Sequence, residues 1–358
     1  MRMGSYEAVF ATLVSATFRR TLRLYIPCFV LLGCVFILAR LGAFVYVNEI
    51  SEQWPYRDFH EHVPPIKPAV WGQLMHLVGS VVEWADILNK TSRVSYMPYA
   101  PPLWTIPVEL KCSLITFACL LGLTKSKPWI RITTLSALSV YFYSRKHPEP
   151  TLFLGGALLA ELHLIRHEKS AAIAAFSPTS VTEVEEARAS TRAHKIKYGA
   201  LFGFGLFLSS FPHHGGGQGS VYRPFYLFST LLVADIGKQV LDLFVSVGAL
   251  IVVYAVSQSP WIQRIFTSPL ARYLGNISFG LYCVHQPLIN WFGFRNMVEL
   301  GRTLGYGKGW ALAFIWQLVV TVWLGDLFWR VVDEPSVRFA RWFESFCEPQ
   351  NESDSFQK

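Results

Sequence analysis

The stretch IPCFVLLGCVFILARLGAFVYV, residues 26–47, holds one charged side chain, Arg40, among 22 residues. An α-helix rises about 1.5 Å per residue, so roughly 20 such residues cross the hydrocarbon core of a bilayer. A helix also satisfies every backbone polar group within the segment, as lipid requires. The stretch therefore predicts a transmembrane helix and an all-α membrane fold.

Further apolar stretches follow along the chain. We interpret seven of them as spans: Leu103–Leu123, Trp129–Tyr143, Thr151–Ile165, Tyr198–Phe211, Val240–Ser257, Asn276–Phe294 and Trp310–Val332. Val70–Leu88 and Phe225–Ile236 are interrupted, and we interpret them as interfacial or re-entrant pieces. The sequence thus predicts a polytopic transmembrane helical bundle of about 8 spans. Its single membrane domain covers 26–335, between a basic cytosolic lead-in at 1–25 and a cytosolic tail at 336–358.

The composition agrees with a membrane location. Hydrophobic residues make up 52% of the chain and charged residues only 16%, against about a quarter charged in a soluble domain. The formal charge is +8. With the amino terminus in the cytosol, 19 basic residues lie on the cytosolic side and 11 on the other. The positive-inside rule therefore predicts two cytosolic termini, and the basic excess indicates a lipid bilayer as partner and no nucleic acid.

The segment LWTIPVELK, residues 103–111, places Glu109 in an apolar run. An ionised side chain near the bilayer centre costs about 3 kcal/mol on insertion scales. A carboxylate at this position therefore indicates either a function or a structural partner. Pro107 is expected to kink the helix and make Glu109 the wall of a polar cavity. The alternative is a structural pairing of Glu109 with Lys111 or Arg40 near the interface.

Ser278, Tyr282 and His285 recur at helical spacing within the predicted span 276–294. Residues at i, i+4 and i+7 share one face, so a hydroxyl, a phenol and an imidazole form one polar stripe. Histidine exchanges protons near neutral pH, which makes His285 a candidate base. The alternative is a hydrogen bond that only holds two helices together.

Three arginines, Arg19, Arg20 and Arg23, precede Pro27 at the start of the first predicted span. Guanidinium groups bind phosphates and developing oxyanions through charge-assisted hydrogen bonds. The alternative is that these arginines only anchor the helix on the cytosolic side.

Four segments together resemble the acyltransferase 3 family of polytopic membrane O-acyltransferases, especially its fungal members. They are RRTLRLYIP at 19–27, LWTIPVELK at 103–111, LGNISFGLYCVHQP at 274–287 and DEPS at 333–336. The resemblance implies transfer of an acyl group to a hydroxyl of a small molecule, lipid or glycan. Acyl-CoA would be the co-substrate, with no metal and no other cofactor. For a fungal chain it implies the endoplasmic reticulum membrane as the location.

Carried onto this chain, the resemblance implies two catalytic residues, His285 and Glu109. It also implies a set of substrate-binding residues: Arg20, Arg23, Trp104, Ser278 and Tyr282. Arg20 and Arg23 would contact the donor or the intermediate, and the others would line the central cavity from two helices.

One expected feature of the family is absent from this sequence. Its members carry a histidine in an earlier helix, after an arginine at a fixed spacing, and no arginine here has a histidine eleven positions later. The predicted number of spans falls short of the family's by two amino-terminal helices. Three interpretations stay open: a truncated chain, another base such as His285, or loss of catalysis. The last leaves a non-catalytic or transporter-like membrane protein as the alternative function.

Overall fold

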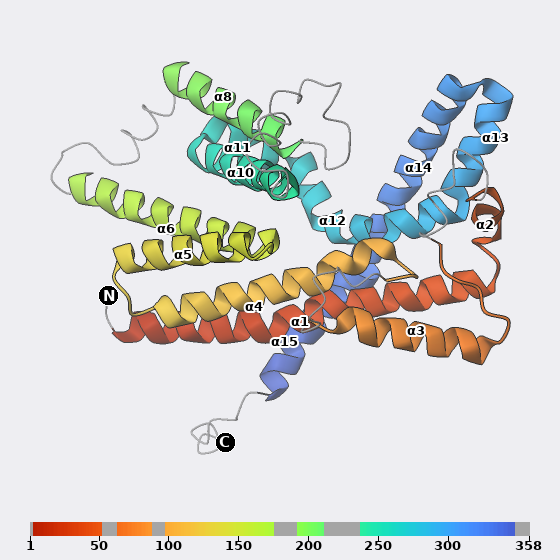
Figure 1. Cartoon of the computed structure of the whole chain (residues 1–358), viewed down its shortest axis with the longest axis horizontal. Helices are drawn as coiled ribbons and strands as arrows, with labels where there is room; N and C mark the ends of the chain where they lie inside the picture. Colours follow the sequence, from red (N-terminus) through yellow and green to blue (C-terminus); the bar gives the residue numbers. More distant parts are fainter. Residues whose placement is uncertain (1–2, 52–62, 88–96, 175–191, 211–236, 348–358) are drawn as a thin grey trace, which may run out of the picture. The chain divides into compact units, whose positions relative to one another are not determined.

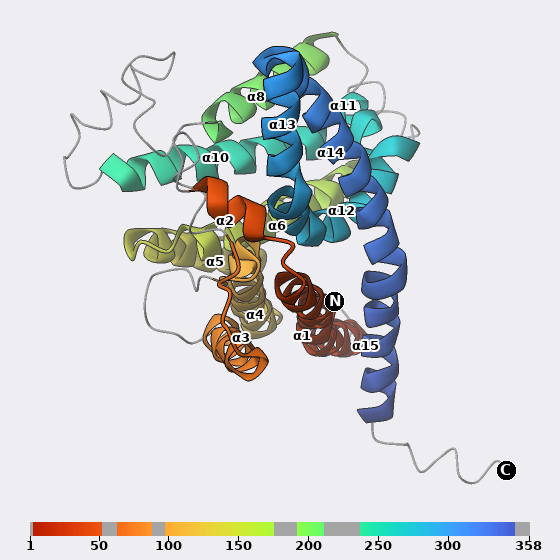
Figure 2. The same cartoon turned by 90° about the vertical axis from the view of Figure 1, so that its right-hand side faces the viewer.

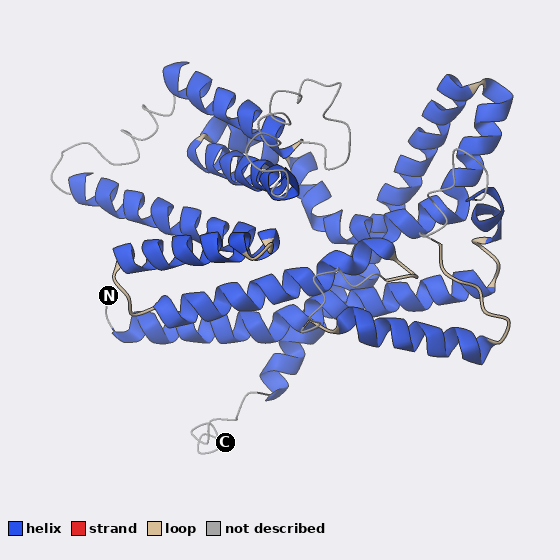
Figure 3. Cartoon of the chain, viewed as in Figure 1, coloured by secondary structure: helices blue, strands red, loops and turns tan. Residues whose placement is uncertain are grey.

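The computed structural model describes residues 3–51, 63–87, 97–174, 192–210 and 237–347. Within these ranges every regular element is helical and no strand occurs (Figure 3), which confirms the predicted all-α class. The interrupted stretch Phe225–Ile236 lies outside the described residues. The chain divides into two compact units: Met1–Lys111 with Tyr273–Lys358 forms unit 1, and Cys112–Arg272 forms unit 2.

Unit 1 is built from both ends of the chain. Its first helices are α1 (Met3–Arg40), α2 (Val45–Ser51), α3 (Val70–Ala85), the 3₁₀ turn η2 (Pro101–Trp104) and the start of α4 (Thr105–Leu123). Its later helices are most of α12 (Pro269–Leu288), the π-helical turn η3 (Ile289–Gly293), α13 (Phe294–Leu304), α14 (Tyr306–Phe328), the π-helical turn η4 (Trp329–Asp333) and α15 (Glu334–Cys347). In Figure 2, α14, η4 and α15 continue one another as a single long helix.

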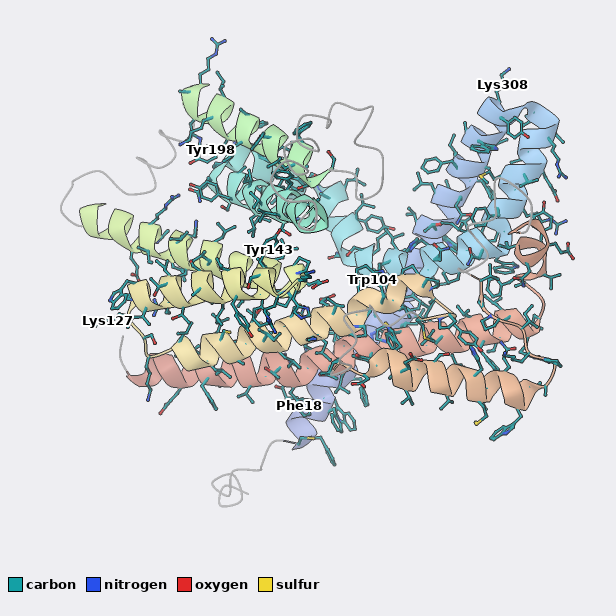
Figure 4. The ribbon with its side chains drawn as sticks, in the orientation of Figure 1. Phe18, Trp104, Lys127, Tyr143, Tyr198 and Lys308 are labelled. Atoms are coloured by element: carbon teal, nitrogen blue, oxygen red, sulfur yellow. The ribbon has the colours of Figure 1, made fainter. Side chains whose placement is uncertain are left out.

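Helix α1 begins far ahead of the apolar stretch that predicted it. It runs without interruption through Pro27, so the arginines at positions 19, 20 and 23 lie inside the helix. Near its middle, α1 packs against α15. The ring of Phe18, labelled in Figure 4, stacks on Phe343 with centroids 5.7 Å apart, and Arg19 forms an ion pair of 3.2 Å with Glu344. Two helices distant in sequence are thereby joined by an aromatic and an ionic contact.

Two glycines fix the crossing of α12 and α14. A methyl group built on Gly280 would collide with the backbone oxygen of Gly325 and come within 3.3 Å of the amide nitrogen of Trp329. Small residues allow two helix backbones to approach this closely in a membrane. The crossing holds α12, with Tyr282 and His285, against the helix that carries η4.

Unit 2 consists of helices α5 (Pro128–Ser144), α6 (Pro148–Ala174), α8 (Arg192–Ser209), α10 (Gly237–Gln258) and α11 (Pro260–Phe266), together with the rest of α4. Figure 1 shows α5 beside α6 and α8 beside α10, and both pairs are in extensive contact. Arg131 and Glu161 form an ion pair of 2.5 Å between α5 and α6. Helix α11 turns away from α10 by 105°.

Three described helical stretches are long and apolar enough to cross a membrane: Glu7–Arg40, Pro101–Leu123 and Tyr306–Cys347. The bent pair α10 and α11 would make a fourth. Each of the eight predicted stretches overlaps a described helix. The described helices therefore support a membrane protein with three or four candidate spans, while the larger number of eight stays a prediction.

Candidate functional site

Glu109 on α4 forms an ion pair with Arg20 on α1. The Nη2 of Arg20 on α1 donates a hydrogen bond of 2.6 Å to the Oε1 of Glu109 on α4. The side chains are 32% and 38% exposed, so the pair is neither buried nor fully solvated. The sequence proposed Lys111 or Arg40 as structural partners; in the structure Arg40 instead donates to the carbonyl of Lys67 at 2.8 Å.

The start of α4 contradicts the kink that the sequence predicted at Pro107. Pro107 is only the third residue of α4, where an amide has no partner within the helix, so its missing N–H breaks no bond. The predicted kink at Pro107 was therefore wrong. What shapes this region is η2, whose Leu103 carbonyl accepts a hydrogen bond of 2.8 Å from the buried indole of Trp84 on α3.

Tyr282 joins α12 to the same region. Its hydroxyl donates to the carbonyl of Pro102 and lies 2.6 Å from the Oγ1 of Thr105. Because a phenol has one hydrogen, the Thr105 hydroxyl must donate in the second bond when Tyr282 donates to Pro102. Thr105 and Glu109 are four residues apart on α4, so they lie one turn apart on the same face of that helix. Arg20, Glu109, Tyr282 and Thr105 thus form one polar cluster, contributed by α1, α4 and α12.

His285 lies nearly one turn further along α12, with its ring centroid 6.1 Å from that of Tyr282. Its Nδ1 is 2.7 Å from the carbonyl of Tyr282 and 3.2 Å from that of Leu281. A carbonyl only accepts, so Nδ1 must carry a hydrogen in these bonds. The neutral ring then keeps its lone pair on Nε2, which is the tautomer that a proton-accepting histidine needs.

Two other predicted residues lie at the surface of unit 1. Ser278 is exposed and donates to the carbonyl of Gly275 in its own helix at 2.8 Å. Trp104, labelled in Figure 4 just before α4, is 39% exposed. Of the predicted stripe on α12, the structure therefore brings Tyr282 into the polar cluster and leaves Ser278 outside it.

Helix α1, which carries Arg23, packs against η4. The last residue of η4, Asp333, is 6% exposed, and the sequence analysis did not select it as a site residue. The available signal was an acidic residue directly after the apolar run 310–332. Thr105 was missed too, because a threonine at a helix start carries no signal of a distant partner.

Comparison with known proteins identifies the family of this chain. Residues 9–330 match the family model of an acyltransferase domain, acyltransferase 3. The chain belongs to the acyltransferase 3 family. It is 26% identical over 357 residues to the O-acetyltransferase PaAT-1 of Phomopsis amygdali, covering 95% of this chain and 69% of that protein.

Two further relatives of the acyltransferase 3 chain are also fungal. The acyltransferase clz18 of Cochliobolus lunatus is 24% identical over 353 residues, covering 91% of this chain and 71% of that protein. An acyltransferase of a Phoma species is 23% identical over 357 residues, covering 92% and 71%. No solved structure matches the chain.

Proposed function

We propose that this protein is an integral membrane O-acyltransferase that moves an acyl group from acyl-CoA to a hydroxyl of a small molecule, lipid or glycan. The observation that carries the proposal is the family match over residues 9–330. A relative that is 26% identical is named an O-acetyltransferase, which supports a hydroxyl acceptor. The polar cluster that contains Arg20 and Glu109 supports the location of the active site at these residues.

The chemistry needs a base for the hydroxyl and positive charge for the oxyanion. Nε2 of His285 takes the proton of the acceptor hydroxyl as its oxygen attacks the thioester carbonyl. The guanidinium of Arg20, held by Glu109, and that of Arg23 stabilise the negative charge of the tetrahedral intermediate. When the intermediate collapses, the carbon–sulfur bond breaks and the CoA thiolate receives the proton from His285. Trp104 and Tyr282 contact the substrates, while a substrate contact of Ser278, which lies outside the polar cluster, stays a prediction.

The proposal includes the topology inferred from basic residues: about eight spans, both termini in the cytosol and, for a fungal chain, the endoplasmic reticulum membrane. This orientation puts the amino-terminal end of α1 on the cytosolic side, where acyl-CoA is available, while Arg20 and Arg23 lie within the candidate span Glu7–Arg40. The sequence left open a non-catalytic or transporter-like protein on the same scaffold. The relatives do not favour that alternative, because all three are named as acyltransferases.

The test is an assay of the detergent-purified protein with radiolabelled acetyl-CoA and longer acyl-CoA donors, following donor hydrolysis and transfer. We expect turnover, and we expect His285→Ala to lower kcat by about 10²-fold or more, as loss of a general base does. His163→Ala is the matched control, since His163 is an exposed histidine of unit 2. Absence of donor binding and turnover in the wild type would exclude the proposed activity.

A further inference from the structure

Helix α15 carries aromatic side chains that are large, apolar and exposed. Phe339, Trp342 and Phe346 are 44%, 58% and 73% exposed. Their spacing of three and four residues places them on one flank of the helix. The ring centroids of Phe339 and Trp342 lie 5.6 Å apart, and those of Trp342 and Phe346 lie 5.8 Å apart. A contiguous exposed apolar surface of this kind marks a contact with lipid or with another protein.

The other flanks of α15 differ in character from the aromatic one. One flank packs on α1 through the contacts of Phe343 and Glu344 already described. Another flank is polar and exposed, and it consists of Arg338, Arg341 and Ser345. At 3.6 residues per turn, these two flanks and the aromatic one divide the circumference of the helix between them. Phe and Trp on one flank and Arg on another are typical of helices at the boundary between lipid headgroups and acyl chains.

The direction of α15 suits that boundary. Figure 2 views α1 nearly end-on, and α15 runs across this view; in Figure 1 as well, α15 runs obliquely across the direction of α1. Helix α1 belongs to the candidate span Glu7–Arg40, so a helix that crosses α1 steeply slopes along the membrane surface. The long helix Tyr306–Cys347 has 42 residues, and about 20 residues cross the hydrocarbon core. Part of this helix therefore extends beyond the core.

The contact between α1 and α15 lies where α1 leaves the hydrocarbon core. No charged residue occurs between Arg23 and Arg40, so Arg23 marks one end of the apolar part of α1. Phe18 and Arg19, which contact α15, precede Arg23 by five and four residues, or about 6–8 Å along the helix. The headgroup layer on each side of the core is about 5–8 Å thick. Helix α15 is therefore attached to α1 at the level of the headgroups.

We propose that α15 is an interfacial helix whose aromatic flank, Phe339, Trp342 and Phe346, contacts phospholipid at the headgroup–acyl boundary. The leaflet is the one at the amino-terminal end of α1, which the sequence predicts to be cytosolic. On the adjoining polar flank, the guanidinium of Arg341 reaches the lipid phosphates along its apolar stem. The lipid of this leaflet thus covers the exposed surface of a segment that the sequence assigned to a cytosolic tail. This contact is independent of acyl transfer.

Fluorescent labelling of the full-length protein in phosphatidylcholine vesicles tests this contact. Trp342→Cys, Phe346→Cys and the matched control Ser345→Cys are made after the exposed Cys34 and Cys347 have been changed to alanine. Each variant carries the environment-sensitive fluorophore NBD, and the labelled parent without a new cysteine supplies the background. We expect labels at positions 342 and 346 to emit at shorter wavelength than the label at 345. They should lose emission to lipids brominated near the headgroup, whereas iodide on both sides of the membrane should quench the label at 345 more strongly.

The native indole of Trp342 gives a second measurement without a label. We expect Trp342→Phe to lose part of the intrinsic fluorescence that brominated lipid quenches in the wild type. Iodide quenching at 342 and 346 as strong as at 345 would place the aromatic flank in water. Quenching by neither agent would show that protein, either a second copy or another chain, covers the flank. Each of these two results, or an unchanged lipid-quenched fluorescence in Trp342→Phe, would overturn the proposed lipid contact.

Discussion

The pair of Arg20 and Glu109 is the contact that makes two costly charges tolerable near a bilayer. Exposed ion pairs contribute little to stability, about 0–1 kcal/mol, and both of these side chains are about a third exposed. Their value must then lie in holding the guanidinium at a defined place. The pair either only links α1 to α4 or also forms part of the active site. Substitution of Glu109 distinguishes these two roles.

Glu109→Ala is expected to lower kcat/KM for acetyl transfer at least tenfold while changing the melting temperature little. Glu109→Gln should keep part of the activity, because its amide oxygen still accepts a hydrogen bond from Arg20. Glu299→Gln is the control, since Glu299 pairs with Arg295 on the exposed face of α13. Wild-type rates in Glu109→Ala would remove the carboxylate from the site.

Tyr282→Phe tests the second link of the polar cluster. The change leaves the carbonyl of Pro102 and the hydroxyl of Thr105 without their shared partner, so we expect a loss of about 1–3 kcal/mol of stability. Thermal unfolding in detergent measures it. Tyr306→Phe is the control, because Tyr306 is 72% exposed, and this variant should unfold like the wild type. An equal loss of stability in both variants would show that the hydrogen bonds of Tyr282 to Pro102 and Thr105 do not stabilise the protein.

Among the helices, the crossing of α12 with α14 does most to position the candidate site. Tyr282 and His285 lie on α12, and Asp333 follows α14 in η4, so their separation depends on how closely the two backbones approach. Gly280 and Gly325 set that approach. The helix pair is therefore sensitive to a single methyl group.

Gly280→Ala is expected to reduce both the melting temperature and acyl transfer, because the added methyl would meet the backbone of Gly325. Gly275→Ala in the same helix meets nothing within 4 Å and should raise stability by up to about 1 kcal/mol, the helix-propensity gain of alanine. Equal behaviour of the two variants would mean that the helices do not cross as closely as described.

For the whole molecule, the property that the sequence predicts most directly is orientation in the membrane. The distribution of basic residues predicts two cytosolic termini, and the sequence carries Asn-x-Ser/Thr acceptors for glycosylation on both predicted sides. Asn89 begins Asn-Lys-Thr in the predicted luminal loop, and Asn351 begins Asn-Glu-Ser in the predicted cytosolic tail. Both asparagines lie outside the described residues.

We expect Asn89→Gln to abolish a glycosidase-sensitive shift in electrophoretic mobility when the protein is expressed in a fungal host. Asn351→Gln should leave the mobility unchanged, since cytosolic acceptors are not glycosylated. Modification at Asn351 would invert the predicted topology and place the amino-terminal end of α1 on the luminal side.

The sequence by itself determined the helical class, the membrane character and the family. These properties are local or additive: the length of an apolar run, the number of basic residues in a loop and a motif of nine residues can each be read without knowing any contact. The same reasoning selected Arg20, Glu109, Tyr282 and His285, because polar groups in apolar helices are conspicuous.

Only the tertiary structure decided which of these residues meet. Arg20 bonds a carboxylate 89 positions away, and Tyr282 bonds a threonine 177 positions away, because helices remote in the chain pack together. The same packing leaves Ser278 at the surface, puts Pro107 in a first turn where it bends nothing, and buries Asp333 at the end of η4. Side-chain spacing defines a face of one helix, but which helix covers that face depends on how the whole bundle packs.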